Sequence, residues 1–150
     1  VLEQFYQQAA LSGGEVDKLI GGKLLIVFPH QNAGAQGAAV NAAAFVEGIL
    51  RSFRDHQLIR PVFGLNSGRV ISGIIGTPSV RMDNTVIGDP VNVAARLCSL
   101  ARSGDRPVMV SEAVAASLKN LYPVEKVDIR SIRGKSQEVE VFAVKVRAAG

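Results

Sequence analysis

Residues 84–97 read NTVIGDPVNVAARL. Within this stretch an extended segment is followed directly by a helix, and the other predicted elements lie before and after it in the chain. The β-branched run at 85–87 favours an extended segment. Asp89 is a suitable helix N-cap, and Pro90 is favoured in a first helical turn. We therefore predict a strand that turns at a glycine into a helix over 90–102.

Upstream of this stretch, two glycines predict a tight β-hairpin. Apolar-rich segments at Val16–Ile20 and Lys23–Phe28 are separated only by Gly21-Gly22. Paired glycines tolerate the positive φ angles that a two-residue hairpin turn requires. The sequence therefore predicts two antiparallel strands with the glycines at their tip.

Hydrophobic periodicity and turn signals place the remaining elements. We predict helices at Leu2–Leu11, at Ala38–Asp55 and from a Ser111 cap to about Leu121, and loops at Pro29–Gly37 and Gly76–Asn84. A second hairpin is predicted for Val62–Asn66 and Arg69–Ile75 around Ser67-Gly68. A strand is predicted at Pro107–Val110, followed by a closing strand pair, Val124–Ile132 and Val139–Val146, around Gly134. Hairpins alternating with helices predict a single α+β domain with helices packed on one sheet.

Composition excludes several classes of protein. The 150 residues are 47% hydrophobic and 20% charged, which suffices for a buried core and excludes disorder. The single cysteine, Cys98, excludes an internal disulfide and a cysteine-based zinc site, and favours a reduced, cytoplasmic setting. The apolar run Leu24–Phe28 is far short of the roughly 18–20 residues that span a bilayer.

The positive charge is spread along the chain. The formal net charge is +4, with no run of Lys and Arg and no interleaved aromatic residues for base stacking. Nucleic acid is therefore not expected as a partner. A small phosphorylated ligand would need only a few well-placed Arg and Lys side chains.

Three segments occur together in an informative order: DKLIGG at 17–22, NSGRV at 66–70, and the stretch at 84–97. In order and separation they resemble the catalytic domain of the class III nucleotidyl cyclases, the adenylyl and guanylyl cyclases. The resemblance extends to IRGK at 132–135. It implies a ferredoxin-like α/β sandwich that forms a head-to-tail dimer with active sites at the interface. It also implies conversion of a nucleoside triphosphate to its 3′,5′-cyclic monophosphate and pyrophosphate, with two Mg²⁺ or Mn²⁺ ions.

Two residues match the positions with which this family reads the base. Lys18 matches the base-reading lysine, whose ammonium can donate to N1 of adenine but faces a donor on guanine. Thr85 matches its partner, which is often threonine in the bacterial branch and can accept from the adenine amino group. The pair implies ATP as the substrate. Either residue could instead be an ordinary strand residue, with Lys18 facing solvent.

Four further positions match family residues that contact ribose or phosphate. Asn92 and Arg96 are four residues apart and share one helix face, where the resemblance implies ribose positioning and stabilisation of charge on the α-phosphate. Arg69 matches a phosphate-contacting arginine contributed by the opposite chain. Arg133 stands where the family usually has a lysine that reaches the terminal phosphates, and Lys135 could share that role; both could equally be surface charges.

The sequence departs from the family at both metal-binding positions. Gly22 occupies the place of an aspartate that holds metal, and the Phe-x-Asp-Ile strand that carries the other aspartate is absent. Asp17 precedes Lys18 on the same predicted strand, so we expect its side chain to point to the opposite face and not to substitute. We also expect the chain to be N-terminally incomplete.

Two hypotheses follow from these departures. In the first, residues 1–150 are one adenylate cyclase domain of bacterial style, the cytoplasmic output module of a longer signalling protein with upstream regulatory or membrane domains. In the second, the domain is a degenerate cyclase that binds nucleotide or pairs with an active partner as a homodimer or heterodimer. Asp89 is explained by helix capping, and Cys98 by packing.

Overall fold

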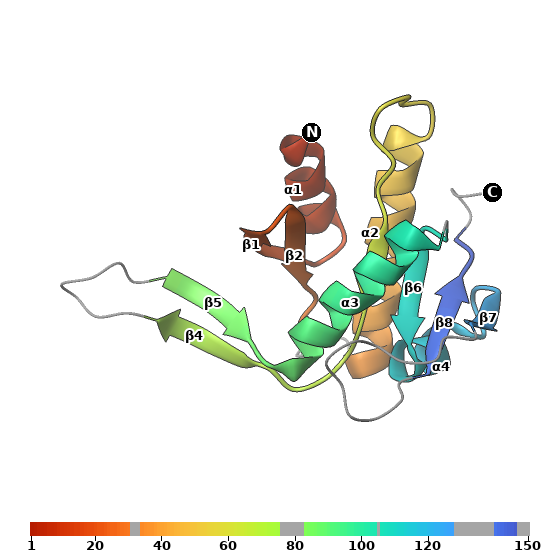
Figure 1. The fold of residues 1–150 in the computed structure, drawn as a ribbon. Coiled ribbons are helices and arrows are strands. Elements are labelled where there is room, and N and C mark those ends of the chain that lie inside the picture. The colour runs from red at the N-terminus through yellow and green to blue at the C-terminus, as the bar shows by residue number, and fades with distance from the viewer. Residues whose placement is uncertain (31–33, 76–82, 105, 128–139, 147–150) are drawn as a thin grey trace.

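The structure is a computed structural model that describes residues 1–30, 34–75, 83–104, 106–127 and 140–146. Its elements follow the order α1 (Leu2–Leu11), β1 (Glu15–Ile20), β2 (Lys23–Val27), α2 (Gly34–Phe53), β3 (Phe63–Leu65), β4 (Ile71–Ile75), β5 (Asp83–Ile87), α3 (Asp89–Ser103), β6 (Val108–Ser111), α4 (Glu112–Leu118), β7 (Val124–Val127) and β8 (Val141–Val144). The predicted α+β class is confirmed (Figure 1).

A four-stranded sheet with the order β3-β6-β8-β7 forms the centre of the domain. β3 runs parallel to β6, whereas β8 pairs antiparallel with both β6 and β7. The predicted closing pair is confirmed for β7 and β8, although residues 140, 145 and 146 of the second predicted strand are not in a strand. Residues 128–132 and 139, with the turn at Gly134, lie outside the described residues.

The predicted second hairpin is wrong. β3 pairs with β6 rather than with the next strand, and β4 pairs antiparallel with β5. The Ser67-Gly68 segment therefore connects two sheets instead of closing a local turn. The physical reason is that all four residues of β6 are buried, so the short apolar β3 gains more by pairing with this central strand than with its sequence neighbour.

Helices cover both faces of this sheet. Along β6, Val108 and Val110 pack in a core with buried residues of α2 and α4, among them Ile49 and Leu118. Met109, between them in sequence, packs instead with Val93 and Leu97 of α3 and with Val141 of β8. The alternation of side chains along the strand thus places α2 and α4 on one face and α3 on the other.

Three predicted helix boundaries are corrected. α2 begins at Gly34, four residues before Ala38, so residues 34–37 are helical and not part of a loop. α3 has Gly88 as its N-cap, with φ +148°, and Asp89 is its first helical residue rather than the cap. α4 ends at Leu118 rather than near Leu121. Within the described residues, no helix combines the length and the apolar character needed to cross a membrane.

Candidate functional site

The β1–β2 hairpin has the two-residue turn that the sequence predicts. Ile20 pairs with Lys23, and between them Gly21 and Gly22 have φ angles of +54° and +83°. These are the left-handed conformations that glycine adopts at little cost. A β-carbon built on either glycine would have no neighbour within 4 Å. This turn, at which the resemblance predicts a metal-binding aspartate, is therefore sterically open.

A β-bulge lies next to the predicted base-reading residue. Val16 pairs with Ile26 and Lys18 with Leu25, so Asp17 is an extra residue on β1. The Lys18 ammonium lies 3.5 Å from an Asp17 carboxylate oxygen, with side chains 30% and 11% exposed respectively. The expectation that these neighbours project to opposite faces is wrong, because the bulge interrupts the alternation and the two charged groups meet.

Lys23, which is not among the residues predicted for the site, joins this hairpin to α3. Lys23 donates from Nζ to Ser99 Oγ at 2.6 Å and to the main-chain oxygen of Ala95 at 3.2 Å. Both acceptors lie on α3, more than 70 residues further along the chain. No local sequence pattern signals such a contact, because it depends on how β2 and α3 come together in the fold.

Helix α3 carries the predicted ribose and phosphate residues. Asn92 is exposed and Arg96 is half-buried one turn later. α3 lies directly on β3, because a β-carbon at Gly64 would overlap the main chain of Ala94 and Cys98. The absence of a side chain at Gly64 therefore sets how closely the helix that carries Asn92 and Arg96 approaches the sheet.

The other predicted site residues occupy neighbouring segments. Thr85 lies on β5 and pairs with Gly73 of β4, and β5 contacts β1, the strand of Lys18. Arg69 is exposed, and its main-chain oxygen approaches Gly88 at the start of α3. The structure thus brings the strands of Lys18 and Thr85 together. Arg133 and Lys135 lie outside the described residues.

The described residues do not fit a pair of divalent cations. Among them, no cluster of three or more His, Cys, Asp or Glu side chains could hold a metal ion. Gly22 offers no ligand, and the Asp17 carboxylate is largely buried beside Lys18. Mg²⁺ is usually bound through carboxylate oxygens, and the described residues bring no such cluster of them together.

Cys98 is half-buried against the sheet, as expected for a packed side chain. Its sulfur lies 3.7 Å from the main-chain oxygen of Val62. Burial raises the pKa of the Cys98 thiol, although Lys23 and Arg102 oppose that rise. The thiol is therefore protonated at neutral pH, which does not suit a nucleophile.

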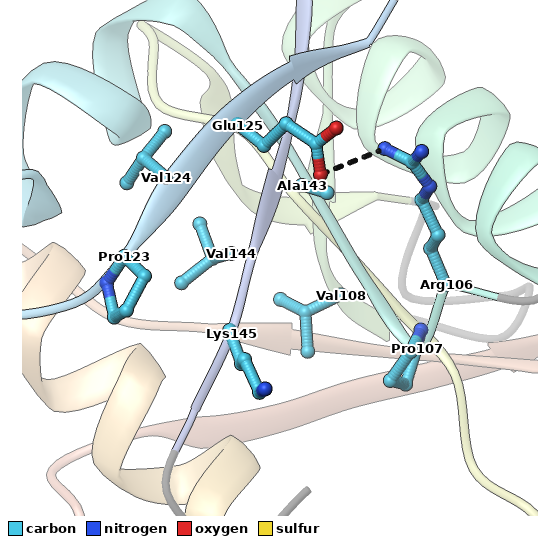
Figure 2. Close-up of a pocket in the computed structure, with 9 residues that line it drawn as sticks. All are labelled: Arg106, Pro107, Val108, Pro123, Val124, Glu125, Ala143, Val144 and Lys145. Atoms are coloured by element: carbon cyan, nitrogen blue, oxygen red, sulfur yellow. Dashed lines mark ion pairs between the residues drawn. The ribbon is translucent and has the colours of Figure 1, made fainter. Parts of the chain in front are cut away.

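A cavity of about 390 Å³ lies at one end of the sheet, among β6, β7 and β8 (Figure 2). Val108, Val124 and Val144 line it, and at its rim Arg106 lies 3.5 Å from Glu125. Of the predicted site residues that the structure describes, none lines this cavity. It is therefore separate from the candidate site on β1, β5 and α3.

Comparison with known proteins identifies the class to which this arrangement belongs. Residues 18–145 match the family described as the adenylate and guanylate cyclase catalytic domain. The chain belongs to this family. The family assignment made from the three motifs is thereby confirmed.

The relatives of this chain include proteins named as adenylate cyclases. The terminal-differentiation-specific adenylate cyclase of Dictyostelium discoideum is 32% identical over 145 residues, which cover 89% of this chain and 7% of that protein. The adenylate cyclase of Anabaena cylindrica is 29% identical over 150 residues, which cover 89% of this chain and 28% of that protein. The chain therefore spans a small part of either relative.

Solved structures share the fold. The adenylyl cyclase CyaB from P. aeruginosa superimposes with a TM-score of 0.75 at 23% identity, covering 99% of this chain and 81% of that one. The guanylate cyclase domain of RhGC from Catenaria anguillulae, in complex with GTP, gives 0.77 at 20% identity, covering 97% and 80%. The fold is thus that of cyclase catalytic domains.

Proposed function

We propose that this chain provides the nucleotide-binding half of an adenylate cyclase active site. ATP would be converted to 3′,5′-cyclic AMP and pyrophosphate at a head-to-tail interface with a second cyclase domain. The observation that supports this most directly is the joining of the Lys18 hairpin to α3, because it connects the strands next to the predicted base-reading lysine with the helix of Asn92 and Arg96.

Lys18 and Thr85 are proposed to select adenine. The Lys18 ammonium is donor-only and suits the N1 acceptor, while a threonine hydroxyl can accept from the adenine amino group. Guanine would present a donor to Lys18, and a mismatched buried donor costs about 1–3 kcal/mol. Contact between β1 and β5, the strands of Lys18 and Thr85, is consistent with a shared base pocket.

Asn92 and Arg96 are proposed to act on the reacting groups. In the cyclisation, the ribose 3′ oxygen loses its proton and forms a bond to the α-phosphorus, while the bond from that phosphorus to the bridging oxygen breaks and pyrophosphate leaves. Asn92 would orient the ribose. The Arg96 guanidinium would stabilise charge on the α-phosphate through paired N–H donors, which a lysine cannot offer in the same geometry.

The second domain would have to provide the carboxylate for which this chain has Gly22. We therefore assign no metal-dependent step to the described residues. A chain of this kind can complete one active site of a heterodimer while the other active site remains silent. The alternative is a module that binds nucleotide without turnover, and the substitution of aspartate by Gly22 favours it where no such partner is present.

Complementation tests the proposal. The chain would be mixed with a cyclase domain that retains both metal aspartates but has alanine in place of its own asparagine and arginine. We expect cyclic AMP to form only in the mixture, and to be lost with Arg96→Ala in this chain. Lys119→Met, at the exposed end of α4, is the control. ATP binding without cyclic AMP in the mixture would instead support the binding module.

A further inference from the structure

Lys23 is placed where it can control the geometry of the candidate site. It directly follows the Gly21-Gly22 turn and opens β2, five residues after Lys18. Its side chain is half-buried and crosses to α3, where it contacts Ala95 and Ser99. Ala95 directly precedes Arg96, so the contact falls on the same helical turn as the predicted phosphate residue.

The contacts of Lys23 form a closed network with matching donors and acceptors. The ammonium donates to Ser99 Oγ at 2.6 Å and to Ala95 O at 3.2 Å, and Ser99 Oγ donates to the same Ala95 oxygen at 3.2 Å. Hydrogen bonds from a charged donor are stronger than neutral ones, so these contacts favour one arrangement of the hairpin on the helix. Lys23 therefore sets the position of the hairpin relative to α3.

We propose that Lys23 is a positioning residue for the nucleotide. It does not act on the reacting atoms but holds the hairpin of Lys18 against the helix that carries Arg96. This inference rests on the proposed function. A hairpin that was free to move would have to be ordered when the base binds, and that cost would lower the affinity for ATP. A ligand without a base would not incur it.

The kinetic test compares ATP, which has a base, with tripolyphosphate, which has none. In the complementing mixture, Lys23→Met should raise the KM for ATP about tenfold, which corresponds to one charge-assisted hydrogen bond. The inhibition constant of inorganic tripolyphosphate should stay within about twofold, since Arg96 remains in place. Lys23→Arg should restore most of the KM, because a guanidinium can also donate to Ala95 and Ser99. Lys119→Met should change neither constant.

Equal loss for ATP and tripolyphosphate would overturn the proposal, because it would show general damage to the fold. An unchanged KM in Lys23→Met would overturn it as well.

Amide hydrogen exchange on the chain without nucleotide separates the inference from the proposed function. Lys23→Met should accelerate exchange in β1 and β2 about tenfold while β6 and α4 stay unchanged. Unchanged exchange would refute the link between hairpin and helix even in an active mixture. If exchange is accelerated in the chain alone but the complementing mixture makes no cyclic AMP, the link between hairpin and helix stands. The proposed function is then refuted, and with it the role of Lys23 in positioning the nucleotide.

Discussion

Asn66 donates a 3.1 Å hydrogen bond from Nδ2 to the main-chain oxygen of Pro90. The bond joins the residue after β3 to the first turn of α3, 24 positions along the chain. Gly68 packs on the same proline, because a β-carbon there would lie 2.6 Å from Pro90 Cγ. The start of α3 is thus fixed against the sheet at the end nearer to Asn92.

Gly64→Ala should destabilise the domain by about 1–3 kcal/mol, the usual cost of overpacking a core. The new methyl group would overlap the α3 main chain, which can move only as a whole. Urea unfolding measures the change. Gly48→Ala, within α2, is the matched control.

At Gly48 the added methyl group would meet only the flexible end of Gln8. Replacement of a mid-helix glycine by alanine is favourable by about 0.5–1 kcal/mol, so we expect this variant to be neutral or more stable. Equal losses in the two variants would contradict the close approach of α3 to Gly64.

Ser111→Ala should cost less than the approximately 1 kcal/mol typical of a lost N-cap side chain. Ser111 is the N-cap of α4 and is 6% exposed, but its hydroxyl makes no capping bond and has no hydrogen-bond partner among the described residues. Removal of a buried unsatisfied hydroxyl relieves a desolvation penalty. Thermal unfolding should show an unchanged or higher Tm, and a clear drop in Tm would indicate a hydrogen bond to this oxygen.

Gly22→Asp should fold, with a loss of about 1 kcal/mol or less in the free energy of unfolding. The backbone at Gly22 has φ +83°, which aspartate tolerates better than most residues, and the space around its α-carbon is open. Gly22→Ala should lose more, because alanine lacks the local hydrogen bonding that eases this conformation. A chemical denaturation series over the two variants checks the order, and a larger loss for aspartate would contradict it.

The β1–β2 hairpin shows how far the sequence could predict the structure. Gly21-Gly22 specifies a local turn, and the turn is where it was predicted. The Ser67-Gly68 pair gave a similar local signal and misled, since β3 is recruited by the distant buried strand β6. The motifs predicted Asn92 and Arg96 as site residues. The hydrogen bond from Lys23 to Ser99 could not be predicted, because it depends on packing between segments far apart in the sequence.

ATP should bind more tightly than GTP by about fivefold to 150-fold, from a penalty of about 1–3 kcal/mol for the donor that guanine presents to Lys18. Competition between the two nucleotides in the complementing mixture measures the ratio. Lys18→Ala should reduce it towards unity, and Lys119→Ala should leave it unchanged. Tighter binding of GTP by the unsubstituted chain would remove the base-reading assignment of Lys18 and Thr85.

Arg96→Ala should lower kcat in the complementing mixture by about 10²–10³-fold, the usual effect of losing one preorganised donor to a developing charge. Asn92→Ala should also reduce turnover, and its exposed position on α3 predicts almost no change in stability. Arg102→Ala, in the exposed last turn of the same helix, is the control. Retention of most of the rate by Arg96→Ala would exclude its action on the α-phosphate.

The open turn at Gly22 bears on the evolutionary history of the domain. A glycine codon becomes an aspartate or glutamate codon by a single base change, and no neighbouring side chain would have to be altered to make room for the carboxylate. A lineage could therefore lose or regain an acidic residue here repeatedly, while selection on the remaining half-site continued undisturbed. Gene duplicates that differ at this one codon would be a natural starting point for obligate pairs of cyclase chains.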